Sequence, residues 1–234
     1  MSLNNKVYIV SGGSSGLGKE MAKALIANNA RVVITGRDAD KLNNVANEID
    51  AIPFHADVTN DAEIEKLFEF VMHEFNQLDG LINNAGVGEE WPLLTEIDRE
   101  KMKNLFDINV FGATMMAAQA AKIFKNQKYG DIVNIASTAS LKGFKNGSVY
   151  AASKFALRAL SQCWQAELRP YNVRVIQINP SEVPTAFNNS DRTEKEQVDN
   201  KLSPKEIADV LIATLKMDRR GFIPEVTVFA TNPF

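Results

Sequence analysis

The sequence has little that would suit it to an oxidising compartment, a membrane or a nucleic acid. Its 234 residues include one cysteine, Cys163, so no disulfide can form within the chain, and we expect this thiol to pack in the core. No run approaches the ~18 apolar residues of a membrane span, and no charged-then-apolar leader begins the chain. The net charge of −3 gives no basic face for nucleic acid. We therefore expect a cytoplasmic protein that binds neither membrane nor nucleic acid.

The sequence is instead dominated by a regular alternation of short apolar runs and amphipathic segments. A hydrophobic content of 45% and a charged content of 24% are typical of globular proteins. Without a repeat, a linker or a low-complexity tract, residues 1–234 are expected to form one domain. Alternating strands and helices predict the α/β class: a Rossmann-type, doubly wound parallel sheet of about seven strands with helices on both faces.

The apolar periodicity locates these elements. Strands are expected at residues 6–10, 31–35, 52–57, 78–82, 131–135, 173–178 and 223–229. Helices are expected through Met21, Leu25 and Ile26 and at residues 38–49, 61–75, 99–124, 149–168 and 204–217. A polar stretch at about 186–202 follows a strand's carboxyl end, where such sheets bind ligands, which predicts a small substrate flap. A solvated surface excursion is the alternative.

Three glycines follow the first expected strand and precede the first helix. Gly12, Gly16 and Gly18 form the pattern Gly-x-x-x-Gly-x-Gly. Glycine allows positive φ and a close approach to a phosphate, and the N-terminus of a helix attracts negative charge. The pattern therefore predicts a site for a phosphate-bearing ligand, although any tight turn between a strand and a helix also favours glycine.

The end of the second strand indicates which dinucleotide is bound. Arg37 follows Gly36 where a cofactor without a 2′-phosphate usually meets an acidic residue. A guanidinium binds a 2′-phosphate through charge-assisted hydrogen bonds, so NADP(H) is favoured over NAD(H). NAD(H) remains the alternative cofactor, because Asp38 would reach the ribose if the loop were shifted by one residue.

A candidate catalytic group lies at the start of the helix at 149–168. Tyr150 and Lys154 are four residues apart and project from one helical face. The ammonium is expected to lower the pKa of the phenol from about 10 towards working pH. Ser137 ends the preceding strand, and a loop with two glycines can bring its hydroxyl beside Tyr150. The two hydroxyls would then bind and protonate a carbonyl oxygen.

Together these motifs resemble the short-chain dehydrogenase/reductase family over essentially the whole chain. Further marks of the family are Asp57, the run Asn83-Asn-Ala-Gly86, Asn109 and Asn179-Pro180. The resemblance implies an NADP-type oxidoreductase similar to 3-oxoacyl-carrier-protein reductases. It implies the catalytic residues Asn109, Ser137, Tyr150 and Lys154, with Asn109 positioning Lys154 through a water.

The resemblance also implies the cofactor contacts. Asp57 and Val58 would meet the adenine, Lys154 the nicotinamide ribose, and Thr185 the carboxamide. The full implied set is Gly12, Ser14, Ser15, Gly16, Leu17, Gly18, Arg37, Asp57, Val58, Asn83, Ala85, Gly86, Tyr150, Lys154, Pro180, Val183 and Thr185. Two positions depart from the family pattern: Ser11 replaces a common Thr, and Ser181 puts a Cβ where a Gly normally follows Asn179-Pro180.

The favoured function is NADP-dependent hydride transfer between nicotinamide and a carbonyl or secondary alcohol. The alternatives are an NAD-dependent alcohol dehydrogenase and a non-enzymatic dinucleotide sensor. Reduction of a carrier-bound 3-oxoacyl thioester is a narrower version, for which Lys142, Lys145 and Arg158 would meet an acidic carrier. No metal site is predicted. The expected apolar substrate lining is Trp91, Phe144 and Phe187.

The helix around residues 110–121 is apolar on nearly all sides, and the helix at 149–168 carries Phe155 and Ala159 away from its catalytic face. Family members pair these two helices across a two-fold axis. A homodimer, or a homotetramer built from it, is therefore expected.

Overall fold

The computed structural model describes residues 1–88, 91–188 and 194–233, and its core is a seven-stranded parallel sheet. The strands are β1 (Val7–Ser11), β2 (Arg31–Gly36), β3 (Ile52–His55), β4 (Gly80–Asn83), β5 (Gly130–Ile135), β6 (Val173–Pro180) and β7 (Glu225–Val228). Their order across the sheet is β3-β2-β1-β4-β5-β6-β7, and each neighbouring pair is parallel. The predicted fold class and strand number are confirmed.

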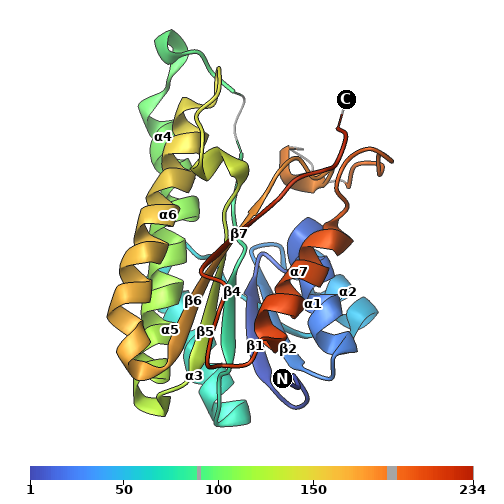
Figure 1. Cartoon of the computed structure of the whole chain (residues 1–234), viewed down its shortest axis with the longest axis vertical. Coiled ribbons are helices and arrows are strands. Elements are labelled where there is room, and N and C mark those ends of the chain that lie inside the picture. Colours follow the sequence, from blue (N-terminus) through green and yellow to red (C-terminus); the bar gives the residue numbers. More distant parts are fainter. Residues whose placement is uncertain (89–90, 189–193, 234) are drawn as a thin grey trace.

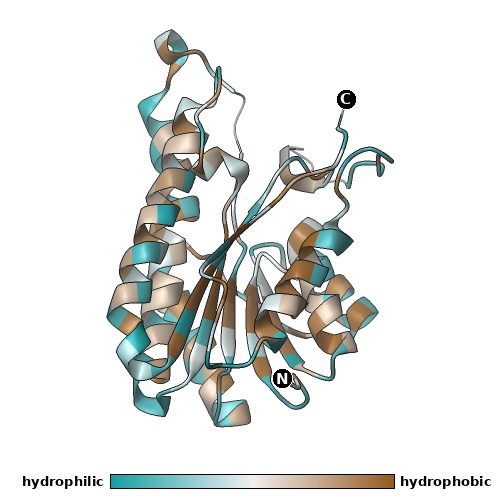
Figure 2. Cartoon of the chain, viewed as in Figure 1, coloured by the Kyte–Doolittle hydropathy of each residue, from teal (hydrophilic) through white to brown (hydrophobic). Residues whose placement is uncertain are grey.

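Helices cover both faces of this sheet (Figure 1). They are α1 (Gly16–Ala27), α2 (Ala39–Ile49), α3 (Asp61–Phe75), α4 (Arg99–Phe106), α5 (Ala113–Gln127), α6 (Ser148–Leu168) and α7 (Pro204–Lys216). One buried apolar cluster joins α1, α2 and α7 to the sheet, and another joins α3 and α5 to its other face. Brown hydrophobic colour follows the strands in Figure 2, while teal residues lie mostly at helix surfaces and loops.

The helix expected at 99–124 is wrong as a single α-helix. It is interrupted by a π-helical turn, η2 (Asp107–Gly112), which separates α4 from α5. Asn109 in this turn bonds the backbone of Val87, and Gly112 packs so closely on Val58 that a Cβ would lie 2.6 Å from the Val58 carbonyl oxygen. Apolar periodicity does not record these contacts to neighbouring segments, and π-turns often accompany functional sites.

Two further expectations have different outcomes. Cys163 is exposed on α6, so the expectation that it packs in the core is wrong. Of the substrate flap expected at 186–202, residues 189–193 lie outside the described residues, and residues 194–202 form neither helix nor strand. No helix among the described residues is long and apolar enough to cross a membrane.

Candidate active site

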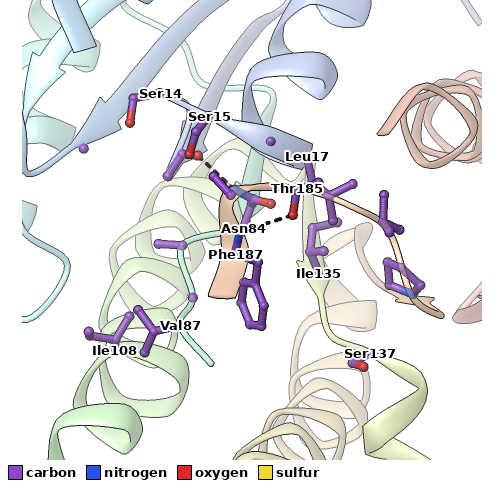
Figure 3. Close-up of a pocket in the computed structure, with 18 of the residues that line it drawn as sticks. Ser14, Ser15, Leu17, Asn84, Val87, Ile108, Ile135, Ser137, Thr185 and Phe187 are labelled. Atoms are coloured by element: carbon purple, nitrogen blue, oxygen red, sulfur yellow. Dashed lines mark hydrogen bonds between the residues drawn. The ribbon is translucent and has the colours of Figure 1, made fainter. Parts of the chain in front are cut away.

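A cavity of about 920 Å³ lies at the carboxyl ends of the strands, over the gap between β1 and β4 where the strand order reverses. Ligands bind at such reversal points in open parallel sheets. Figure 3 shows part of its lining, with Ser14, Ser15 and Leu17 on one side and Ser137 on the other. The predicted residues that line the cavity are Gly12, Ser14, Ser15, Gly16, Leu17, Arg37, Asp57, Val58, Ala85, Gly86, Ser137, Tyr150, Lys154, Pro180, Val183 and Thr185.

The turn between β1 and α1 has the backbone geometry that the glycine pattern predicts. Gly12 and Gly16 have φ values of +64° and +51°, in the region that side chains disfavour. A Cβ on Gly18 would lie 2.2 Å from the Gly12 carbonyl oxygen, so Gly18 packs beneath the turn and does not line the cavity. The first turn of α1 has no acidic residue, which leaves its positive end suited to an external phosphate.

Ser11 and Asn84 join this turn to the end of β4. The Ser11 hydroxyl oxygen accepts hydrogen bonds from the backbone N–H groups of Asn84 and Ala85, each at 3.0 Å. The Asn84 side chain donates to the carbonyl oxygens of Ser11 and Gly12, at 2.9 and 3.1 Å. The Ser11 hydroxyl thus joins the two segments, and a threonine at this position would carry the same hydroxyl.

Asn83 requires a correction, because its side chain does not line the cavity. Its amide nitrogen donates to the Ala113 carbonyl and to Asn134 Oδ1, inside the layer between β5 and α5. Asn84 lines the cavity instead. Neighbouring side chains of a strand face opposite ways, and the resemblance alone selected the wrong member of the pair.

Arg37 lines the cavity from the loop after β2. Its side chain is 56% exposed, and its Nε lies 4.0 Å from an Asp57 carboxylate oxygen. Asp38 caps α2, where its carboxylate accepts the Lys41 N–H at 2.9 Å. The guanidinium is therefore accessible from the cavity, whereas the Asp38 carboxylate already has a structural hydrogen bond.

Tyr150 and Lys154 lie on the first turns of α6, and β5 delivers Ser137 to the same place. The Ser137 hydroxyl hydrogen-bonds to the Tyr150 phenol, and Lys154 Nζ donates to the Ile135 carbonyl at 3.2 Å. Lys154 Nζ lies 5.7 Å from the centre of the Tyr150 ring. The three predicted side chains therefore converge at one end of the cavity.

The expected lowering of the Tyr150 pKa is wrong for this structure. Burial raises the pKa of Tyr150 to about 12, and the Ser137 hydrogen bond opposes that shift. Burial also lowers the pKa of Lys154 to about 8. Both side chains are buried, so the loss of water around each charged form outweighs the benefit expected from their pairing. Tyr150 accordingly keeps its proton at neutral pH.

Asn109 does not line the cavity but lies just behind it. Its Oδ1 accepts the Val87 N–H at 2.8 Å, and its Nδ2 donates to the Val87 carbonyl at 2.9 Å and to Ser153 Oγ at 3.3 Å. A Cβ built on Gly86 would lie 3.3 Å from Asn109 Oδ1 and 3.6 Å from Lys154 Nζ. Asn109 and Lys154 thus both lie close to Gly86.

Comparison with known proteins assigns the family. The short chain dehydrogenase family model matches residues 6–196. An uncharacterized oxidoreductase of Staphylococcus aureus (strain N315) is 32% identical over 235 residues, covering 97% of each chain. The chain belongs to the short-chain dehydrogenase family.

Solved structures of similar proteins agree with this short-chain dehydrogenase over its whole length. An alcohol dehydrogenase of the archaeon Thermococcus sibiricus, complexed with 5-hydroxy-NADP, gives a TM-score of 0.90 at 25% identity and covers 97% of each chain. A metagenomic short-chain oxidoreductase in complex with NADP gives 0.85 at 30% identity and covers 97% of this chain and 98% of that one. The fold and the oxidoreductase class therefore rest on both sequence and structure.

Two aromatic rings pack against Tyr150 in this short-chain dehydrogenase. Trp91 and Phe187 line the cavity and meet the Tyr150 ring edge-on, with centroids 5.5 and 5.7 Å away. Phe144, the third expected lining residue, is not in the lining; it is 47% exposed and packs on Trp91 at 5.4 Å. Trp91 and Phe187 form what we call the aromatic wall.

The remaining predicted positions lie on the segment that follows β6. Thr185 packs on the glycine turn, where its Cβ would be 3.2 Å from a Cβ on Gly16. The Ser181 N–H donates to the Val228 carbonyl at 2.8 Å, which continues the pairing of β6 with β7. Among the described residues, no group of three His, Cys, Asp or Glu side chains could hold a metal ion.

Sequence reasoning about this short-chain dehydrogenase missed two residues that bond the glycine turn. Asn84 had a usable signal, since it adjoins Asn83 and strand alternation turns one of the two towards the site. Glu194 had none: its carboxylate accepts the Gly16 N–H at 2.7 Å, across 178 residues of sequence.

Proposed function

We propose that this short-chain dehydrogenase is an NADP-dependent carbonyl reductase in which Tyr150 is the general acid. One observation carries the proposal: a hydrogen-bonded Ser137–Tyr150 pair and a buried Lys154 share a single cavity with the glycine turn and Arg37. A dinucleotide with its phosphates at the glycine turn would extend its nicotinamide towards Tyr150. A non-enzymatic dinucleotide sensor would have no use for a proton donor there.

The preference for NADP rests on Arg37 and Asp38. Arg37 and Asp38 both border the cavity, but a guanidinium favours a 2′-phosphate, and the Asp38 carboxylate is already bonded to the N-terminus of α2. The two structural neighbours in NADP-type complexes support the same choice. The residues present thus fit an NADP cofactor.

In the proposed reaction the bound cofactor supplies a hydride to the carbonyl carbon of the substrate. The Ser137 and Tyr150 hydroxyls hold the carbonyl oxygen and stabilise the negative charge that develops on it. Tyr150 then donates its proton to that oxygen, and the product is an alcohol. Lys154, buried beside the phenol, would carry positive charge below its pKa of about 8 and thereby favour the phenolate left after proton transfer.

The aromatic wall supports a carbonyl substrate with an apolar or aromatic substituent. Trp91 and Phe187 present ring surface next to the proton donor, and aromatic pairs favour such edge-on or stacked contacts. The narrower hypothesis is that the substrate is a thioester on an acidic carrier, which Arg158 would help to bind. Arg158 Nε instead bonds the Glu225 carboxylate at 3.1 Å, so this hypothesis has one supporting cation fewer. We therefore favour a free ketone or aldehyde.

Substitution of the wall tests this substrate class. Trp91→Ala and Phe187→Ala should each lower kcat/KM for an aryl ketone about tenfold or more, and should change acetone reduction much less. The ratio of the two substrates within one variant is the control for any loss of folded protein. An unchanged ratio in both variants would contradict the apolar substrate class.

We also propose that the active form is a homodimer or homotetramer. Phe111 on η2 and Phe155 on α6 are 56% and 42% exposed in the single chain. Burial of such rings against a second copy stabilises an oligomer. Light scattering at micromolar concentration should give at least twice the mass of one chain, and a monomer would contradict this.

The primary test is the initial rate of reduced-cofactor consumption on a panel of ketones, aldehydes and 3-oxoacyl thioesters, with NADPH and NADH in parallel. Turnover of free ketones or aldehydes that prefers NADPH is the expected result. A clear preference for NADH would instead favour the NAD-dependent alcohol dehydrogenase. Binding of both cofactors without turnover in either direction would favour the dinucleotide sensor.

A further inference from the structure

The N-terminus of α1 holds a carboxylate from a distant part of the chain. Glu194 Oε1 accepts the Gly16 N–H at 2.7 Å, and Glu194 Oε2 accepts the Ala186 N–H at 3.2 Å. Gly16 is the first residue of α1 and belongs to the glycine turn, whereas Ala186 follows β6. One carboxylate therefore bridges the glycine turn and the segment after β6.

This end of α1 has no anion of its own. The 12-residue helix has no acidic residue in its first turn, and its N-cap residue, Ser15, makes no side-chain capping bond. The partial positive charge of the helix is thus met by a charge from elsewhere in the chain. The neighbouring helix α2 differs, because Asp38 caps it locally and Asp40 lies in its first turn.

The same end of α1 is where the cofactor's pyrophosphate must bind if the proposed function is correct. A carboxylate and a phosphate need the same N–H donors, and two negative groups repel each other at this distance. From this shared position we infer that Glu194 is an internal ligand of the pyrophosphate site, and that the cofactor must displace its carboxylate from Gly16 and Ala186 to bind. This inference rests on the proposed function, and it identifies Glu194 as a residue that competes with the cofactor pyrophosphate for the same N–H groups.

Displacement of Glu194 also affects the substrate side of the cavity. Ala186 is followed by Phe187, which packs on Tyr150, and the Phe187 N–H donates to Thr185 Oγ1 at 3.4 Å. The segment that Glu194 ties to α1 therefore carries one half of the aromatic wall. Displacement of Glu194 by the cofactor would release this tie.

The test measures the NADPH dissociation constant by calorimetry for the whole protein and two matched variants. Glu194→Gln removes the competing charge, and Asp199→Asn removes an equal charge from an exposed residue five positions along that does not line the cavity. Glu194→Gln should bind NADPH about threefold to tenfold more tightly than the unaltered protein, and Asp199→Asn should differ by less than about twofold. Equal or weaker binding by Glu194→Gln than by Asp199→Asn would overturn the inference.

Two fragments localise the competition. ADP contains a pyrophosphate, whereas adenosine 2′-monophosphate contains none. Glu194→Gln should tighten ADP binding and leave adenosine 2′-monophosphate unchanged, while equal tightening of both would show a general charge effect and would overturn the inference. If no form of the protein binds NADPH or NADH, the proposed function fails together with this inference; if NADPH binds equally to all forms, only this inference fails.

Discussion

The two ends of the parallel sheet use buried polar side chains in different ways. At the amino ends of β5 and β6, Asp131 accepts both Nε and Nη2 of Arg174 at 2.7 Å, and Nη1 of Arg219 at 2.9 Å. Arg174 also donates to the carbonyls of Leu215 and Met217. At the carboxyl ends, buried Lys154 donates to one backbone carbonyl and the Tyr150 phenol bonds Ser137. At the amino ends the charged side chains are paired with opposite charges, whereas at the carboxyl ends the buried Lys154 ammonium bonds a backbone carbonyl.

The buried polar groups at the two ends therefore contribute differently to the molecule. The Asp131 network joins β5, β6 and the segment after α7, so its groups stabilise the folded chain. The groups at the carboxyl ends are buried without equivalent partners, and burial shifts their pKa values in the direction that disfavours charge. Substitutions should therefore affect stability at one end and cofactor or substrate chemistry at the other.

The largest effect on stability is expected at Asp131. Asp131→Asn leaves the buried guanidinium of Arg174 and the partly exposed one of Arg219 without their carboxylate, so the free energy of unfolding should fall by about 3–5 kcal/mol. Urea unfolding measures this change, and Asp209→Asn, which breaks an exposed pair with Lys205, is the matched control and should change little. NADPH affinity of the folded Asp131→Asn protein should remain unchanged. Equal stability of the two variants would contradict the structural role of the Asp131 network.

A pH-dependent effect of similar size is expected at Lys154. Its folded-state pKa of about 8 lies below the ordinary value of 10.5, so the folded chain releases this proton earlier than the unfolded chain. The cost of the buried ammonium is fully present below pH 8 and disappears as the pH rises towards 10.5.

Lys154→Met removes this titration. The unfolding free energy of the unaltered protein, minus that of the variant, should therefore rise by roughly 2–3 kcal/mol between pH 7 and pH 10. Denaturant unfolding at several pH values measures the slope, and Lys66→Met on the exposed face of α3 should give a flat difference. A flat difference for Lys154→Met as well would show that its ammonium is not penalised in the folded state.

A smaller and selective effect is expected at Arg37. Arg37→Ala removes charge-assisted hydrogen bonds to a 2′-phosphate, so NADPH affinity should fall about 10- to 100-fold while NADH affinity changes less than about threefold. Calorimetric titration with both cofactors measures this selectivity. Arg220→Ala, at a cation 91% exposed in its side chain, should alter neither affinity. Equal loss of both cofactors would contradict a 2′-phosphate site at Arg37.

The sequence predicted the sheet well because strand and helix periodicities are local. The expected helix at 61–75 coincides with α3, and all seven strands lie at or close to their expected ranges. The convergence of Ser137, Tyr150 and Lys154 was also predictable, since two of them share a helical face and the third ends the adjoining strand. The π-turn at Asp107–Gly112 was not, because it depends on contacts with Val87 and Val58.

The other misses have the same cause. Burial of Tyr150 and Lys154 reversed the expected pKa shift of the phenol, and burial is a property of the folded chain. The bond from Gly16 to Glu194 joins residues 178 positions apart, and no pattern in the polar stretch distinguishes Glu194 from Glu196. Contacts of this kind become visible only once the loops at the carboxyl ends are placed.

The proton-donor role of Tyr150 is tested most directly by Tyr150→Phe, with NADPH turnover and NADPH affinity measured on the same preparation. The substitution keeps the ring that packs on Trp91 and Phe187 and removes only the hydroxyl that bonds Ser137. Carbonyl reduction should fall by about 10²- to 10⁴-fold, while the NADPH dissociation constant changes less than about threefold. Full turnover by Tyr150→Phe would contradict the assignment of Tyr150 as the general acid.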